Sequence, residues 1–276
     1  MTRRQARAAA WQALEGATLL LVGVLIMFPI VWMVMTAFKP LEFIYHLNIF
    51  FTPTLDNFRE VFSPRWEVGL KVMNSLVIAT GTVIVATPIA VCAAYAFSRQ
   101  QFRFKRAMFQ WILLTQFIPG VAIILPFYLM FRTLGLLDTY AALIIVDLAI
   151  VLPYAIWTIK GFIDAIPEET EEAATIDGAG LFGLLWHIIV PMARPGILTA
   201  AIFCFIITWN EFLFALILSR SRVVPLSVGI MSFRLERGDL WELISATGIL
   251  IAIPMFFLAM VIQRHFIKGM TAGAIR

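Results

Sequence analysis

The chain has 276 residues, of which 61% are hydrophobic and only 14% are charged, and its formal net charge is +4. This composition excludes an ordinary soluble domain, because a soluble chain of this length could not cover so much apolar surface. The small positive charge does not indicate a nucleic-acid partner, since basic residues flank membrane spans for topological reasons.

Six stretches are apolar and long enough to cross a bilayer, which takes about 20 residues each. In chain order they run over residues 17–38, 74–97, 108–131, 140–162, 197–218 and 240–262. The sequence therefore predicts an all-α membrane protein with six transmembrane helices. We expect one domain over residues 1–276, in which the first span is peripheral and residues 74–262 form the core.

The basic residues predict the orientation of these spans. Arginines precede the first span and no small-residue cleavage site follows it, so we expect a retained span and not a removed signal peptide. A short loop over residues 99–106 carries a cluster of basic residues, and short basic loops stay in the cytoplasm. Both termini, and the loop 164–196 between the fourth and fifth spans, are therefore expected in the cytoplasm.

The loop 164–196 contains an acidic stretch that reads as a short helix. Pro167 suits the first helical position, where its missing N–H costs nothing. Glu168 and Glu169 would lie at the positive end of the helix dipole. Gly178 is placed to end the helix in a left-handed conformation.

The glutamates of this helix face one another at spacings of three and four residues, which destabilises an isolated helix by about 0.2–0.5 kcal/mol per pair. The nearest basic residues that the sequence suggests are Lys160 and Arg194. We therefore expect a cationic partner from outside the chain, with a solvated acidic turn as the alternative. The apolar segment 181–190 is too short to span, so the spans, lipid headgroups or a partner must bury it.

The same loop carries a spaced motif: Glu172-Ala173-Ala174, Gly178 after three residues, and Ile188-Ile189-Val190-Pro191 after nine more. It resembles the signature loop of bacterial ABC importer permeases, with Val190 where that family usually has leucine. Three further stretches are similar to carbohydrate-uptake permeases related to the maltose system: Thr208-Trp209-Asn210-Glu211-Phe212, residues 225–229, and the tail 263–274.

This resemblance implies that the loop is a coupling helix seated in a cleft of a cytosolic ATPase subunit. The residues it assigns to this coupling loop are Glu171, Glu172, Ala173, Ala174, Asp177, Gly178 and Pro191. It implies an importer for a sugar or sugar derivative in a bacterial or archaeal plasma membrane. The implied partners are a dimer of ABC ATPase subunits, a second permease chain and an extracytoplasmic solute-binding protein.

We expect no catalytic residue, cofactor or metal ion in this chain, with ATP and magnesium bound by the partner ATPase. The sequence has no glycine-rich phosphate loop followed by lysine and serine or threonine. His46, His187 and His265 lie in three different loops, each without a second ligand at metal spacing.

Polar residues inside the predicted spans are candidates for a path for a hydroxyl-rich solute, since such groups tend to face a bundle interior or water. These candidates are Gln116, Asp147, Trp209, Asn210 and Glu211. The alternative is structural hydrogen bonding between helices.

Three other functions are alternatives to a sugar permease. One is a permease for glycerol phosphate or another polyol, which the same resemblance allows. A self-contained secondary transporter would normally show internal repeats, and no repeat is visible. An intramembrane protease would need a paired aspartate or a serine and histidine inside the spans, and neither is present.

Overall fold

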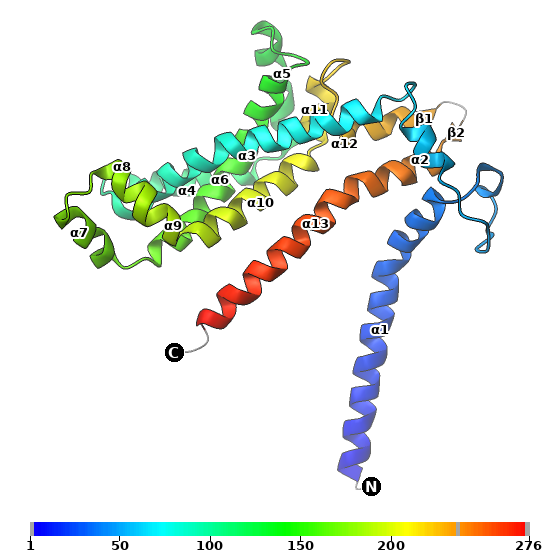
Figure 1. Cartoon of the computed structure of the whole chain (residues 1–276), viewed down its shortest axis with the longest axis horizontal. Coiled ribbons are helices and arrows are strands. Elements are labelled where there is room, and N and C mark those ends of the chain that lie inside the picture. The colour runs from blue at the N-terminus through cyan, green and yellow to red at the C-terminus, as the bar shows by residue number, and fades with distance from the viewer. Residues whose placement is uncertain (1–2, 236–237, 274–276) are drawn as a thin grey trace. The chain divides into compact units, whose positions relative to one another are not determined.

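A computed structural model describes residues 3–235 and 238–273, and these residues are mostly helical (Figure 1). They fall into two compact units. The first unit comprises residues 1–67 and 230–253, and the second comprises residues 68–229 and 254–276.

The first unit contains one long helix, shorter helical turns and a pair of short strands. Its elements are α1 (Arg3–Ala37), a 3₁₀ turn (Leu41–Phe43), α2 (Asp56–Val61), a second 3₁₀ turn (Ile230–Phe233), β1 (Arg234–Leu235), β2 (Gly238–Asp239) and the first part of α13 (Trp241–Gly273). The strands pair antiparallel, with Arg234 opposite Asp239. The amide of Asn57 donates to the carbonyls of Ala37 and Lys39, both at 2.9 Å, and so ties α2 to the end of α1.

The second unit holds the remaining helices. They are α3 (Val68–Arg99), α4 (Lys105–Leu114), a 3₁₀ turn (Thr115–Phe117), α5 (Gly120–Thr133), α6 (Tyr140–Asp164), α7 (Glu168–Ile176), α8 (Leu181–Leu184), a π-helical turn (Leu185–Ile189), α9 (Val190–Met192), α10 (Arg194–Trp209), α11 (Leu213–Leu218), α12 (Leu226–Gly229) and the rest of α13.

Helices α3, α6 and α10 form the core of this unit. The residues that line their contact are small, and close backbone approach is how helices associate where lipid removes the usual hydrophobic driving force. Ala86, Ala90, Ala155 and Ala200 are all at most 1% exposed. Gly196 at the start of α10 leaves no room for a Cβ beside the ring of Phe162 on α6. The three helices therefore pack as one body.

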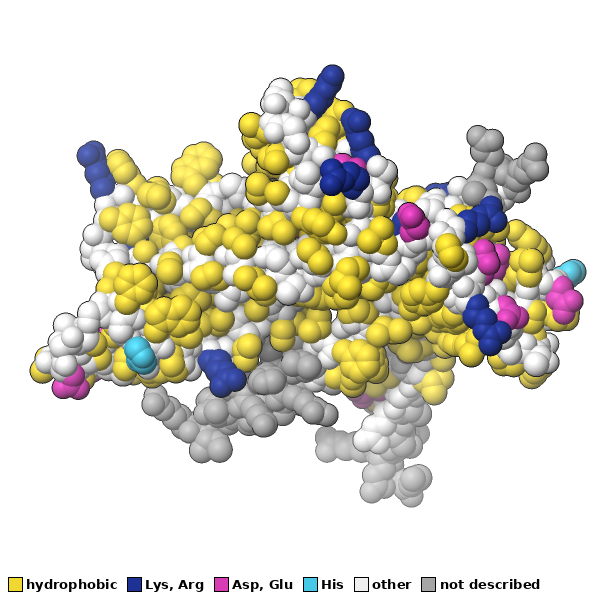
Figure 2. All heavy atoms as spheres, turned by 45° about the horizontal axis from the view of Figure 1, so that its top comes forward, with side chains coloured by type: hydrophobic (Ala, Val, Ile, Leu, Met, Phe, Trp, Pro, Cys, Tyr) yellow, Lys and Arg dark blue, Asp and Glu magenta, His cyan; other side chains and the backbone are white. Residues whose placement is uncertain are grey.

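The surface is apolar, as a membrane protein requires. Figure 2 shows hydrophobic side chains over most of the visible face and few charged ones. In the described residues, four single helices are long and apolar enough to span: Leu14–Ala37, Val68–Arg99, Tyr140–Asp164 and Trp241–Met260. Two bent pairs raise this number to six if each pair is one span: Lys105–Phe117 with Gly120–Thr133, and Leu181–Met192 with Arg194–Trp209.

Two of the expected spans are not continuous helices. The stretch 108–131 breaks before Pro119, and its halves meet at 98°. Proline forces the preceding residue out of the helical region, and Ile118 accordingly has ψ 118°. The stretch 197–218 is interrupted between Trp209 and Leu213, where α10 ends and α11 begins.

A carboxylate at the turn between α5 and α6 fixes the segment that follows α11. Asp138 Oδ1 accepts the N–H groups of Arg220 (2.9 Å) and Val223 (3.1 Å). Its Oδ2 accepts those of Ser221 (3.1 Å) and Arg222 (2.9 Å). Partial burial by itself would raise the pKa of Asp138, but these backbone donors outweigh it and lower the pKa to about 2.

We expect Asp138→Asn to lower the free energy of unfolding by about 1–2 kcal/mol, because asparagine loses the charge and one acceptor oxygen that these N–H groups face. The pKa is depressed from an ordinary value of 3.8, so the stabilisation is complete above about pH 4 and is lost as the pH falls toward 2. Thermal unfolding between pH 7 and pH 3 measures it. Asp56→Asn is the control, because Asp56 forms an exposed ion pair with Arg59. A difference between wild type and D138N that stays constant down to pH 3 would contradict the assignment.

Candidate functional site

The acidic helix of the loop between α6 and α10 ends before Gly178, as the sequence predicts, but begins one residue later than predicted. α7 begins at Glu168, and Pro167 lies one position earlier than expected, at the N-cap. The left-handed conformation expected at Gly178 is confirmed, with φ +88°. The N–H of Gly178 donates to the carbonyl of Thr175 and that of Ala179 to Ala174, both at 3.0 Å. These bonds satisfy carbonyls that the end of a helix leaves free.

The prediction of a cation from outside the chain is wrong for Glu171, and Glu168 Oε1 also lies 3.9 Å from Arg99 Nη1. Arg99, the last residue of α3, places its Nε 2.6 Å from Glu171 Oε1, and both side chains are only 10% exposed. The Tyr95 hydroxyl donates to the other oxygen of Glu171 at 3.3 Å. Neither Lys160 nor Arg194 supplies this contact. The sequence does not indicate this pairing, because Arg99 lies 72 residues before Glu171.

Arg99 also caps the C-terminal end of α6. Its Nη2 donates to the carbonyl of Ile163 at 3.0 Å and to that of Ile166 at 2.6 Å. The neighbouring Ser98 hydroxyl donates to Asp164 Oδ1, and Lys160 Nζ meets Asp164 Oδ2, both at 2.6 Å. The ends of α3, α6 and α7 are therefore joined by one network of charged and polar side chains.

One face of α7 is exposed, and so is the start of α8. Ile176 is 86% exposed and Phe182, at the start of α8, is 77% exposed. Glu172, Ala173 and Asp177 are exposed beside them. Of the remaining expected coupling residues, Ala174 is half-buried against the core, while Gly178 and Pro191 are exposed. We call the exposed set Glu172, Ala173, Ile176, Asp177 and Phe182 the loop surface.

The apolar segment that follows is only partly covered. Leu184 and Ile189 are buried in the core of the second unit. Phe182 and Trp186 remain 77% and 61% exposed, respectively. The spans thus bury one side of this segment and leave the other side available to headgroups or to a partner.

The polar motif at the end of α10 is largely explained by local hydrogen bonds. The carboxylate of Glu211 accepts the N–H groups of Phe214 at 2.8 Å and Ala215 at 2.9 Å, and so caps the start of α11. Trp209 is buried and its ring stacks on that of Phe205. Asn210 is exposed, and its amide donates to the carbonyl of Ile206 at 2.8 Å.

The other two candidates lie in separate hollows. Gln116 lines a cavity of about 410 Å³ together with aromatic side chains such as Phe127 and Phe214, and it donates to the carbonyl of Ile150 at 3.3 Å. Asp147 is buried in a much smaller pocket that Glu211 also lines. The five candidates for the solute path therefore do not form one site.

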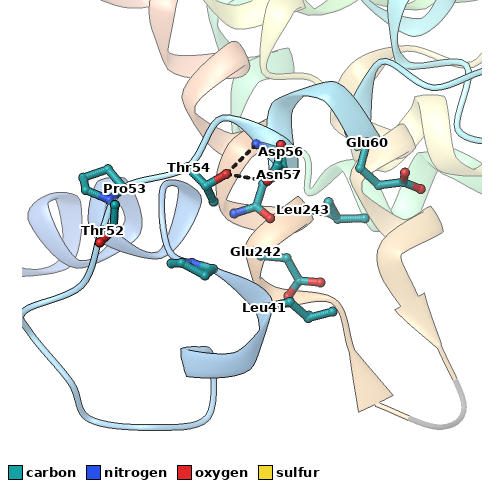
Figure 3. Close-up of a pocket in the computed structure, with 10 residues that line it drawn as sticks. Leu41, Thr52, Pro53, Thr54, Asp56, Asn57, Glu60, Glu242 and Leu243 are labelled. Carbon is teal, nitrogen blue, oxygen red and sulfur yellow. Dashed lines mark hydrogen bonds between the residues drawn. The ribbon is translucent and has the colours of Figure 1, made fainter.

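No pattern in the sequence indicates the hollow of the first unit. It has a volume of about 680 Å³ and brings α2 residues together with Glu242 of α13 (Figure 3). The polar groups of α2 are engaged locally: Asp56 accepts from the Thr54 hydroxyl at 2.7 Å, and Glu60 accepts from the Trp66 indole at 2.9 Å. These bonds hold the segment 52–60 in place.

Comparison with known proteins gives consistent matches. Residues 86–272 match the family model described as "Binding-protein-dependent transport system inner membrane component". The chain is 32% identical to the trehalose transport system permease protein SugB of Mycobacterium tuberculosis, over 98% of each chain. It is also 32% identical to the diacetylchitobiose uptake system permease protein DasC of Streptomyces coelicolor, over 94% of this chain and 95% of DasC.

A solved structure shares the fold. It is one chain of a bacterial ABC transporter involved in the import of alginate, with a TM-score of 0.82 and 21% sequence identity. The match covers 96% of this chain and 99% of the other. The arrangement of helices described above is therefore the one seen in that transporter chain.

We expect Arg99→Ala to lower the free energy of unfolding by about 3 kcal/mol, because it leaves the Glu171 carboxylate buried without its cation. Amide hydrogen exchange over residues 168–176 should become faster, since α7 loses its main anchor. The double variant R99A/E171A should lose less than the sum of the two single variants. Glu169→Ala, an exposed position on the same helix, is the control. Additive single effects would show that the two side chains do not interact.

Proposed function

The chain belongs to the family of binding-protein-dependent transport system inner membrane components, and from this we propose that it is the membrane-spanning subunit of an ABC importer for a sugar or sugar derivative. It would carry the solute into the cytoplasm, driven by a separate ATPase. The chain itself is a transport subunit and not an enzyme. ATP and magnesium would bind to the ATPase.

The observation that carries this proposal is the anchored loop. Arg99 and Glu171 fix the inner side of α7, while the loop surface presents two large apolar side chains and two carboxylates outward. An exposed apolar patch of this kind on a held helix favours a partner protein. We propose that the cytosolic ATPase receives the loop surface, with Glu172 facing a basic side chain.

A rigid attachment of this kind suits mechanical coupling. A ligand shifts an equilibrium between conformations only by binding them differently. If ATP-bound and ATP-free dimers of the ATPase hold α7 at different positions, α3, α6 and α10 would follow, because their small-residue contacts make them one body. The path for the solute would then open on one side of the membrane at a time.

The remaining partners are proposed from the family and its relatives. We propose a second permease chain, two ATPase subunits and an extracytoplasmic solute-binding protein. A related structure is that of an alginate transporter in complex with an alginate-bound periplasmic protein, with a TM-score of 0.67 and 16% sequence identity. We propose six spans, counting each bent pair once, with both termini and the loop 164–196 in the cytoplasm.

The proposed solute is a carbohydrate because relatives are described as transporting trehalose, diacetylchitobiose and sulfoquinovosyl glycerol. The last of these keeps a polyol derivative as the alternative. Of the residues proposed for the solute path, exposed Asn210 and the cavity-lining Gln116 are the most accessible. The other three proposed residues would support the path without contacting the solute directly: Trp209, Asp147 and Glu211.

Co-purification tests the proposed function directly. The tagged chain is extracted gently from its native membrane, and the proteins that accompany it are identified. An ABC ATPase together with a second permease is the expected result. A chain that is recovered alone and transports in liposomes without ATP would overturn the proposal in favour of a secondary transporter.

We expect Glu172→Lys to uncouple ATP hydrolysis from transport, because the reversed charge would repel the basic side chain proposed on the ATPase. Gly178→Val should act similarly, since a β-branched residue is strained at φ +88°. Uptake should fall at least tenfold while basal ATP hydrolysis by the reconstituted complex persists. Glu15→Lys on α1 makes the same charge change at another exposed position and is the control. Wild-type uptake by both loop variants would disprove this role.

We expect Asn210→Leu to raise the KM for uptake several-fold, since about 1 kcal/mol is lost with one hydrogen bond to a solute hydroxyl. Leucine has a similar size and cannot donate or accept. The initial rate of uptake is measured against solute concentration, with ATP hydrolysis followed in the same vesicles. Asn48→Leu, in the exposed segment after α1, provides the matched substitution. Unchanged kinetics in N210L would remove Asn210 from the solute path.

A further inference from the structure

A small pocket lies within the second unit between α3, α6 and the end of α10. Four oxygen-bearing side chains line it: Ser75 of α3, Asp147 of α6, Thr208 of α10 and Glu211 just beyond α10. Apolar side chains complete its wall. Its volume is about 10 Å³, which is the room that a single water-sized occupant requires.

Two of these side chains lack partners in the described part of the chain. Thr208 is 5% exposed, and its hydroxyl has no hydrogen bond to any described residue. Asp147 is 4% exposed, and no hydrogen bond or ion pair between described residues uses its carboxylate. Buried polar groups nearly always form hydrogen bonds. The Thr208 hydroxyl and the Asp147 carboxylate therefore indicate that the pocket holds an occupant.

The other two side chains are engaged but keep acceptor capacity. The Ser75 hydroxyl accepts the N–H of Leu226 at 2.7 Å. Each carboxylate oxygen of Glu211 accepts one backbone N–H, from Phe214 or Ala215, and an ionised carboxylate has further lone pairs. The pocket therefore offers oxygen acceptors from four side chains.

The ionisable groups that line the pocket are both acids. Two carboxylates line it, and no Lys, Arg or His is among the described residues of its wall. Two carboxylates that share a site repel each other, so the pocket favours an occupant with positive charge.

Depth in the membrane strengthens this preference. Asp147 is the eighth residue of α6, and at 1.5 Å per residue it lies about 10 Å from the start of that helix. A charge at such depth is costly unless it is compensated. In addition, α10 ends beside the pocket at Trp209, and the C-terminal end of a helix carries negative partial charge.

We propose that this pocket binds one monovalent cation of the size of sodium, held by Asp147, Thr208, Ser75 and Glu211. Carboxylate and hydroxyl oxygens are the donors that hard cations prefer. Calcium takes six to eight oxygens and magnesium keeps several waters, and the pocket has room for neither arrangement. The cation would link the three core helices α3, α6 and α10 near the end of α10 at Trp209.

Thermal unfolding in different salts tests the site without reference to transport. The full chain, together with whatever subunits purify with it, is unfolded in sodium chloride and in choline chloride at equal ionic strength, so that screening is the same. Choline is too large for the pocket. We expect the Tm to rise with sodium concentration in a saturable way, by at least about 2 °C. Equal Tm values in the two salts would overturn the proposal and leave a water molecule or a shared proton as the occupant.

Two substitutions locate the effect. Asp147→Asn should abolish the sodium-dependent rise in Tm, and its Tm in choline chloride should not fall below that of wild type, because the uncompensated charge is gone. Thr208→Val, which preserves the shape of the side chain, should weaken the affinity for sodium at least tenfold. This variant tests the site if D147N does not fold. Asp164→Asn, on the same helix but outside the pocket, should keep the full rise. A rise that survives in both pocket variants would place the cation elsewhere and refute the site.

Discussion

The ion pair between Arg99 and Glu171 is the contact on which the loop-bearing end of the second unit depends. One guanidinium, at the last residue of α3, meets a carboxylate in the first turn of α7 and two carbonyls at the end of α6. Each partner is at a helix end where its charge complements the local dipole or free carbonyls. Because a single side chain joins three helix ends, the outward face of α7 is fixed without any partner protein.

Much of this architecture follows from local sequence signals, and the rest depends on distant contacts. Long apolar runs predict the helices, and Gly178 predicts the end of α7, because both signals act within a few residues. The pairing of Arg99 with Glu171 joins residues 72 positions apart and leaves no local pattern. Similarly, nothing near Asp138 indicates that its carboxylate receives four N–H groups from residues 220–223. The break before Pro119 carried a local signal, but hydropathy across the stretch 108–131 hides it.

The polar residues of the membrane segments show why residue type alone does not assign a role. Glu211 and Asn210 are neighbours in one motif, yet the first caps α11 and the second is exposed. Asp147 comes from another helix and shares a pocket with Glu211, whereas Gln116 lines a cavity of its own. The different roles of Asn210 and Glu211 follow from the break between α10 and α11, since a continuous helix would have placed the same side chains along its faces.

The close contact of Gly196 with Phe162 makes α10 move together with α6. With no Cβ between them, α6 and α10 cannot slip past each other without losing this fit. α10 has 16 residues, so it extends about 24 Å from the loop to its interrupted end at Trp209. A displacement of the loop end would therefore be transmitted along α10 to its other end at Trp209. The absence of a side chain at Gly196 thus couples any movement of α10 to the neighbouring α6.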